Sequence, residues 1–177
     1  LAGLIAFHRA HNRLATVTQG TNSYSYAYNG LGDRLRQTEN GVPTTYTVDL
    51  AAGLTQVLAD GTNTYLYGFA RIGEEQPGGW HYHLGDALAS VRQLTSASSV
   101  VGLTRAYQPY GTTLSSAGTA SSIYHFTGEQ RDANGLVFLR ARYYSSSVGR
   151  FMTRDTWPND DATPQSMNMW SYVSNNP

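Results

Sequence analysis

Short turns of the Asn-Gly and Asp-Gly type recur along the first half of this chain and constrain its fold more than any other feature. They occur at Asn29–Gly30, Asn40–Gly41 and Asp60–Gly61, and a Pro-Gly-Gly stretch follows at Pro77–Gly79. These residues tolerate the positive φ angles of type I′ turns, so each turn predicts a β-hairpin. The last three recur about every 20 residues, the length of two short strands and their turns. The spacing therefore predicts a degenerate repeat of hairpins.

The residues between these turns alternate as they do in strands, where every second side chain lies on the same face. The alternation predicts two aromatic faces, one of Tyr24, Tyr26 and Tyr28 in "SYSYAY" and one of Tyr65, Tyr67 and Phe69 in "TYLYGF". The many tyrosines and the abundant Gly, Ser and Thr suit half-buried strands and tight turns. Neighbouring hairpins are expected to form one continuous sheet, because each hairpin covers the edge of the next.

The pattern changes after Leu94. The small residues of "TSASSVVG" and "TLSSAGTASS" predict linkers or loops on either side of "LTRAYQPYG", and Asn134–Gly135 predicts one more hairpin. Beyond Ser145 the alternation fades into an irregular segment. Its one helical candidate is "SMNMWSYV", where apolar residues recur every third position. The predicted fold class is all-β: a spiralling sheet of repeated hairpins that ends in an irregular C-terminal plug with one short helix.

Composition excludes several classes of function. The formal net charge is zero, so the chain has no long-range attraction for nucleic acid or for an anionic membrane. The absence of cysteine excludes disulfides and thiolate metal sites. No apolar run approaches the roughly 20 residues of a membrane-spanning helix. The first residue is Leu1 rather than Met, and we expect this chain to be a fragment of a longer polypeptide.

Five segments of the second half, in order, resemble a known family. They are "YHLGDALASVRQL", "YQPYG", "FTGEQRDANGLVFLRARYY", "GRFMTRD" and "SYVSNNP". Their order and spacing are similar to the RHS repeat-associated core domain, and the tyrosine-centred hairpins before them resemble degraded RHS/YD repeats. The resemblance is loose from about His8 and close from Trp80 to Pro177.

The resemblance implies two parts, hairpin repeats over residues 1–79 and the core domain over residues 80–177. In this family, which includes toxin-complex C components, polymorphic toxins and teneurins, the repeats spiral into a hollow shell and the core domain closes one end. The chain is therefore expected to be a shell segment and end plug of a secreted or cell-surface bacterial protein. Its expected partners are the preceding repeats and a C-terminal toxin of the same polypeptide.

The resemblance also implies a self-cleavage site of the aspartic-protease type. An arginine in "RYY" and an aspartate after "GRF" match Arg142 and Asp155, and the second aspartate of the family motif would follow Pro177. Two carboxylates must share a proton and hold a water for such cleavage, so the site is incomplete in this sequence. Asp160 and Asp161 lie in a stretch of ordinary turn chemistry and are not candidates. "RDTWP" departs from the aspartate–proline pair usual in the family, which weakens the case for cleavage.

Structural roles compete with these assignments. Arg142 and Asp155 can equally form a buried pair that ties the plug to the wall. Arg140 and Arg150 are expected to stack on Tyr143 or Tyr144. Two histidines at i, i+2 in "HYH", with an aspartate nearby, have a spacing seen in some zinc sites, but His-Leu-Gly-Asp segments are routine in the family. We predict neither a metal site nor a cofactor.

A second class of function stays open. The chain can belong to an extracellular adhesin or filament subunit that has no cargo and no catalysis and that assembles with itself. Tyrosine faces can also stack on sugar rings, so cell-surface glycans are a further class of partner. Nucleic acid is not expected, because the chain is neutral.

Overall fold

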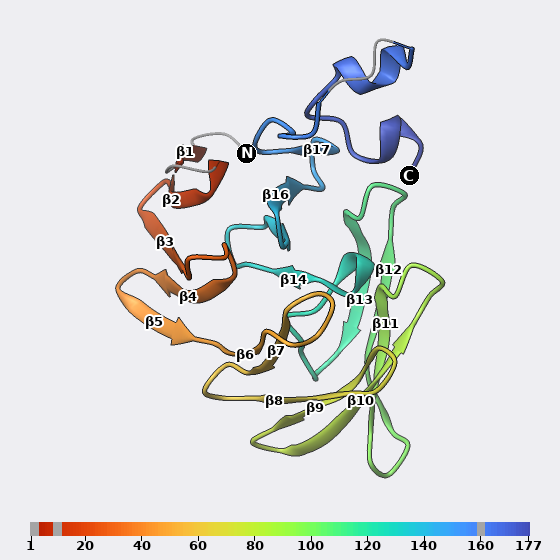
Figure 1. The fold of residues 1–177 in the computed structure, drawn as a ribbon. Coiled ribbons are helices and arrows are strands. Elements are labelled where there is room, and N and C mark those ends of the chain that lie inside the picture. Colours follow the sequence, from red (N-terminus) through yellow and green to blue (C-terminus); the bar gives the residue numbers. More distant parts are fainter. Residues whose placement is uncertain (1–3, 9–11, 159–161) are drawn as a thin grey trace.

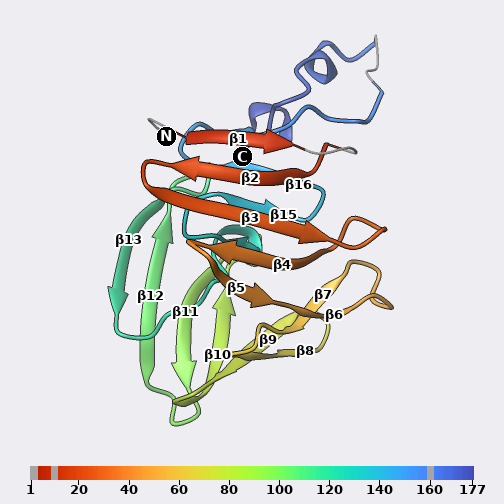
Figure 2. The same cartoon turned by 90° about the vertical axis from the view of Figure 1, so that its left-hand side faces the viewer.

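A computed structural model describes residues 4–8, 12–158 and 162–177, and within these ranges the fold is all-β, as the sequence predicts. The first thirteen strands are antiparallel neighbours in chain order and form a sheet of five strands followed by a sheet of eight. Figures 1 and 2 show the two sheets as one curled strip. A third sheet of four short strands lies on the concave side of the strip (Figure 1).

The elements follow one another as a meander. The five-stranded sheet contains β1 (Leu4–His8), β2 (Leu14–Gln19), β3 (Asn22–Tyr28), β4 (Arg34–Glu39) and β5 (Val42–Thr45). The eight-stranded sheet contains β6 (Thr47–Asp49), β7 (Gln56–Ala59), β8 (Thr64–Tyr67), β9 (Arg71–Gln76), β10 (Gly79–Gly85), β11 (Val91–Ser96), β12 (Val101–Tyr107) and β13 (Thr113–Gly118). The third sheet contains β14 (Gln130–Arg131), β15 (Val137–Leu139), β16 (Arg142–Ser145) and β17 (Arg150–Phe151). The 3₁₀ turns are η2 (Phe126–Gly128), η3 (Pro164–Met167) and η4 (Val173–Asn175).

The predicted hairpin turns are confirmed. Asn40 and Gly41 have φ angles of 48° and 85° and join β4 to β5. Pro77 and Gly78 form the turn between β9 and β10. The turns after Asn29 and Asp60 are wider, and in both the side chain of the first residue accepts hydrogen bonds from backbone amides of the loop. Local turn chemistry therefore sets the layout of the strip.

The tyrosine faces point into the concave side, with one exception. Tyr24, Tyr26 and Tyr65 are buried, whereas Leu66 between two inward residues of β8 is 41% exposed. The prediction that Phe69 shares the face of Tyr65 is wrong, because Phe69 is fully exposed. The strand β8 ends at Tyr67, and a tight turn closed by a hydrogen bond from the Gly68 amide to the Ala70 carbonyl rotates Phe69 outward.

Two stretches predicted as linkers are strands. Much of "TSASSVVG" and "TLSSAGTASS" belongs to β11, β12 and β13, which are full members of the eight-stranded sheet. Small residues are needed here because the backbones approach closely. A Cβ added at Gly118, whose φ is +107°, would lie 2.1 Å from the carbonyl oxygen of Gly102. Glycine in these segments thus permits close strand pairing and does not mark a flexible linker.

The C-terminal helix predicted over "SMNMWSYV" is also wrong. The segment contains two separate 3₁₀ turns, η3 and η4, and all three residues of η4 have positive φ. Between them lies a turn around Met169 and Trp170, and the amides of Phe151 and Asp155 donate to the carbonyls of Trp170 and Met169. These backbone hydrogen bonds compete with those of a helix.

The eight-stranded sheet runs without interruption from β9 into β10, across the predicted boundary between residues 79 and 80. The division into repeats and core domain therefore stays a prediction. In the described ranges the structure contains no helix long and apolar enough to cross a membrane.

Candidate functional site

The C-terminal segment after β13, here called the plug (residues 121–158 and 162–177), fills the concave side of the strip. Tyr143 of β16 packs against Tyr26 of β3 with ring centroids 5.0 Å apart. Tyr124 packs edge to face against Tyr65 of β8 at the same centroid distance. Leu136 of the plug is completely buried beside residues of β2 and β3. The plug therefore shares its hydrophobic core with both sheets of the strip.

A buried ion pair ties the plug to the strip. Arg34 of β4 is 3% exposed, and its Nη1 donates to Asp132 Oδ2 at 2.7 Å and to the Tyr143 hydroxyl at 2.7 Å. Its Nη2 donates to Gln130 Oε1. Burial by itself lowers the pKa of Arg34, but Asp132 and Tyr143 more than offset that effect, so the pKa lies above its ordinary value. Arg34 is thus firmly charged in the core.

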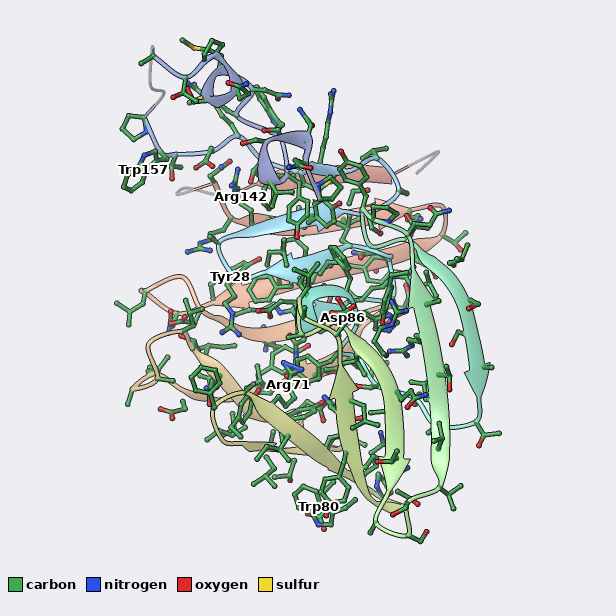
Figure 3. All side chains as sticks on the ribbon, turned by 90° about the vertical axis from the view of Figure 1, so that its right-hand side faces the viewer. Tyr28, Arg71, Trp80, Asp86, Arg142 and Trp157 are labelled. Atoms are coloured by element: carbon green, nitrogen blue, oxygen red, sulfur yellow. The ribbon has the colours of Figure 1, made fainter. Side chains whose placement is uncertain are left out.

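A second arginine–aspartate pair, Arg142 with Asp155, lies at the outer end of the plug. Figure 3 labels Arg142 and the nearby Trp157. Arg142 Nη2 is 2.7 Å from Asp155 Oδ2, and the two side chains are 18% and 38% exposed. The guanidinium carbon of Arg142 lies 3.6 Å from the centre of the Phe151 ring. The structure therefore brings together both residues that the sequence proposes for a cleavage site.

The backbone around Asp155 is fixed from two sides. Its amide donates to the Met169 carbonyl at 2.8 Å, and Arg142 Nη1 reaches the same carbonyl at 3.3 Å. Asp155 Oδ1 accepts a hydrogen bond from the Trp157 amide at 3.0 Å. An open groove beside Asp155 is lined by Asn12, Arg154, Asp155, Thr156, Trp157, Pro158 and Met169. The carboxylate thus lines an open groove and is paired with one guanidinium.

This arrangement can hold a peptide or a water next to one carboxylate, but hydrolysis of the aspartic-protease type needs two. No second carboxylate lines the described part of the groove. Asp160 and Asp161, which the sequence does not favour, lie outside the described residues. The pair by itself can position one half of such a site.

The expectation that Arg140 and Arg150 stack on Tyr143 or Tyr144 is wrong. Arg140 pairs with Glu129 at 3.0 Å and donates to the carbonyl of Thr55, and Arg150 is exposed. The arginine beside the Tyr143 ring is Arg34, whose guanidinium carbon is 5.8 Å from its centre. A residue more than a hundred positions away in sequence occupies the stacking position, and no local pattern indicates it.

The histidines of "HYH", His81 and His83, lie on the inner face of the strip. His83 Nε2 is 3.2 Å from Oε2 of the fully buried Glu74, which also accepts a hydrogen bond from the Ser122 hydroxyl at 2.9 Å. Asp86 instead accepts hydrogen bonds from the amides of Leu88 and Ser90 in its own loop. In the described ranges no three His, Cys, Asp or Glu side chains gather as a metal site requires.

Sequence reasoning missed the polar residues that hold plug and strip together. Arg34, Asp132 and Gln130 form one network, and Glu74, His83 and Ser122 form another. In sequence these residues look like ordinary polar strand and turn positions. Alternation does not mark Arg34 as an inward residue, because Arg36, two positions along the same strand, is exposed.

Comparisons with known proteins agree with this architecture, although no protein-family model matches the chain. The chain is 28% identical over 163 residues to the tRNA3(Ser)-specific nuclease WapA of Bacillus spizizenii, which covers 86% of this chain and 7% of the relative. It is 24% identical over 212 residues to the toxin subunit YenC1 of Yersinia entomophaga, which covers 100% of this chain and 21% of the relative. The chain thus spans only a small part of the relatives it matches.

Solved structures share the fold over the whole chain. A crystal structure of TcdB2-TccC3 aligns with a TM-score of 0.75 at 20% identity, covering 100% of this chain and 10% of that chain. The Tc holotoxin pore of Photorhabdus luminescens, with a substituted TccC3, aligns with a TM-score of 0.69 at 17% identity, covering 99% of this chain and 10% of that chain. These likenesses show a common fold of curled strip and plug.

Proposed function

We propose that this chain forms a section of wall and the end closure of a shell around a C-terminal cargo. The ground for this proposal is that the chain belongs to the RHS-repeat proteins, together with WapA and the YenC and TccC toxin subunits. The cargo is a toxin domain that follows in the same polypeptide. The chain's own contribution is structural: it ends the strip and seals it.

The observation that carries this proposal is the seating of the plug on the concave face. Leu136 and Tyr144 are completely buried, and Arg105 of β12 donates to the carbonyls of Tyr124 and Ser122 in the plug. A curled sheet whose hollow side is filled by its own chain closes one end of any space that preceding hairpins enclose. The geometry fits an end closure better than an isolated binding module.

The second part of the proposal concerns self-cleavage. Asp155, held by Arg142, supplies one carboxylate of an aspartyl site, and the second carboxylate comes from the chain beyond Pro177. One carboxylate accepts a proton from the attacking water, the other donates a proton to the leaving amine, and one peptide bond is hydrolysed by one water. Severing the chain just after the plug frees the cargo inside a shell that stays closed.

Processing of the full-length parent protein tests the cleavage. We expect Asp155→Asn and Arg142→Gln to abolish the shorter product on a blot, whereas Glu75→Gln, an exposed carboxylate of β9, leaves it unchanged. Resistance of the plug to added protease verifies that each variant folds. Normal processing of Asp155→Asn would refute the catalytic assignment and leave the shell proposal standing.

The same proposal places the parent protein outside the cell or on its surface. It also assigns toxin-complex subunits as partners, since the matched crystal structure contains TccC3 together with TcdB2. Fractionation of a producing culture tests the location. Recovery of the parent exclusively in the cytosol, under conditions where the toxin acts on other cells, would contradict it.

One observation favours a second function, the binding of glycans. On β10 the rings of Trp80 and Tyr82 lie 6.4 Å apart with an interplanar angle of 19°, and Tyr82 is 37% exposed on the outer face. Near-parallel aromatic rings on an exposed sheet face can stack on sugars. A glycan array that gives hits lost in Trp80→Ala supports this function, and an array without hits removes it.

A further inference from the structure

An arginine-lined cavity lies between the two sheets of the strip and the plug, separate from the groove beside Asp155. Its volume is about 270 Å³, and Figure 3 shows the labelled Arg71 in the space between the sheets. Four arginines line it: Arg13, Arg34, Arg71 and Arg140. Within the described part of the chain, the carboxylates that line it are those of Asp33 and Glu129.

Only two of these arginines have a carboxylate partner. Arg34 pairs with Asp132 at 2.7 Å, and Arg140 pairs with Glu129 at 3.0 Å. For Arg71 and Arg13, no carboxylate oxygen of the described residues lies within 4.0 Å. The cavity therefore carries positive charge that the protein itself does not neutralise at close range.

The two unpaired guanidinium groups are held in place but keep free donors. Arg71 Nη2 donates to the Gly128 carbonyl at 2.7 Å, and its guanidinium carbon lies 3.0 Å from the centre of the Tyr124 ring. Arg13 Nη1 donates to the carbonyls of Arg140 and Ala141 at 2.9 and 3.1 Å. Arg71 Nη1 and Arg13 Nη2 have no hydrogen-bond acceptor among the described residues, so each remains able to donate.

The backbone leaves room for this arrangement. Gly32 has a φ of +93°, and a Cβ added there would lie 2.2 Å from Arg13 Nη2. A side chain at this position would displace the Arg13 guanidinium from the cavity wall. Arg140 holds a φ of 54°, which is uncommon for a residue with a side chain, and its carbonyl is one of the two acceptors for Arg13.

We propose that this cavity binds a small oxoanion, a carboxylate or phosphate group, between the guanidinium groups of Arg71 and Arg13. The planar guanidinium presents two N–H groups that match the oxygens of such a group, and charge-assisted hydrogen bonds are the strong ones. The inference stands independently of the proposed shell function and of the cleavage site.

Size and access restrict the ligand. A cavity of about 150 Å³ holds a benzene-sized molecule, so 270 Å³ admits phosphate or the end of an acidic side chain. The cavity shares Gly53, Tyr67, Arg71, Glu129 and Arg140 with an adjoining open groove, which gives a route of entry. The anion has two possible sources: a free small molecule, or a glutamate or aspartate side chain of an enclosed segment.

Isothermal titration calorimetry on the purified parent protein at low salt tests the proposal with two probes. Inorganic phosphate represents the free anion, and N-acetylglutamate amide represents an acidic side chain. We expect saturable one-site binding of at least one probe, weakened by added salt. Arg71→Gln should reduce affinity about tenfold or more, whereas Arg131→Gln, which removes an exposed arginine of β14, should leave it unchanged.

Arg71→Lys separates charge from geometry: it keeps the charge but not the fork, and we expect an intermediate affinity. Arg13→Gln serves as the second variant if Arg71→Gln does not fold. The relative affinity of the two probes identifies the source of the anion. Absence of saturable binding by both probes, or equal loss of affinity in Arg71→Gln and Arg131→Gln, would overturn the proposal.

Discussion

The strip and the plug are stabilised in different ways. Within each sheet of the strip, each strand pairs with its neighbour in the sequence, and several of the turns between strands contain residues that adopt positive φ angles. In the plug, strands are two to four residues long and most stabilising contacts come from distant segments. The strip is therefore specified locally, whereas the plug depends on the strip for its structure.

The two arginine–aspartate pairs show the same difference. Arg34–Asp132 joins strip to plug, with side chains that are 1% and 4% exposed. Arg142–Asp155 joins two parts of the plug, with side chains that are 18% and 38% exposed. Both pairs have a closest distance of 2.7 Å, so burial and surroundings, and not distance, distinguish a structural pair from one available for chemistry.

The largest expected effect comes from breaking the buried pair. Arg34→Leu leaves the buried Asp132 carboxyl group without its ion-pair partner, which should lower the free energy of unfolding by about 3–5 kcal/mol. Urea unfolding measures the loss, and limited proteolysis should show cuts in the plug before cuts in the strip. Arg36→Leu on the same strand is the control, because Arg36 is exposed. Simultaneous cutting of strip and plug would contradict their hierarchy.

The next effect tests the close pairing within the strip. Gly118→Ala places a Cβ against the Gly102 carbonyl at a residue with positive φ. This should lower the free energy of unfolding by roughly 2–3 kcal/mol. Gly30→Ala is the matched control, since a Cβ there meets nothing within 4 Å. Here we expect the proteolytic cuts in β12 and β13, with the plug around Asp155 intact. Equal stabilities of the two variants would show that the edge strand simply shifts.

A pH titration of the free energy of unfolding tests the plug separately from the strip, because His125 belongs to the plug. Burial, together with the charges of Arg105 and Arg131, lowers the pKa of His125 to about 3. The unfolded chain binds this proton near pH 6.5 and the folded chain does not, so stability falls as pH decreases from about 6.5 toward 3. By pH 4.5 the loss should be about 3 kcal/mol.

His125→Gln removes that pH dependence if His125 causes it. His81→Gln on β10 is the control, and it should retain the wild-type slope of unfolding free energy against pH. A slope that is the same in all three proteins would assign the acid sensitivity to other groups.

Much of this fold could be predicted from the sequence, and the failures have a common cause. Asn40–Gly41 and Pro77–Gly78 specify their turns because the φ angles are a property of those residues. β12 and β13 were missed because their small residues serve a neighbouring backbone, which a local pattern does not reveal. The predicted C-terminal helix was lost to pairing with Phe151 and Asp155, again a contact between distant segments.

The candidate site was predictable in part, for the same reason. A family resemblance indicated Arg142 and Asp155, and the structure places them in contact. The residues that seat the plug, Arg34 above all, have no local signature, because their role arises when the strip curls over residues about a hundred positions later. The sequence alone therefore does not reveal the long-range polar contacts in the core.

The smallest expected stability effect is the most informative about function. Asp155→Asn keeps an acceptor for the Trp157 amide and removes only the ion pair with Arg142. Because this pair is partly exposed, the free energy of unfolding should fall by less than about 1 kcal/mol, while processing of the parent protein should stop. A loss comparable to that of Arg34→Leu would instead make Asp155 a structural anchor of the plug, and the distinction between the two pairs would disappear.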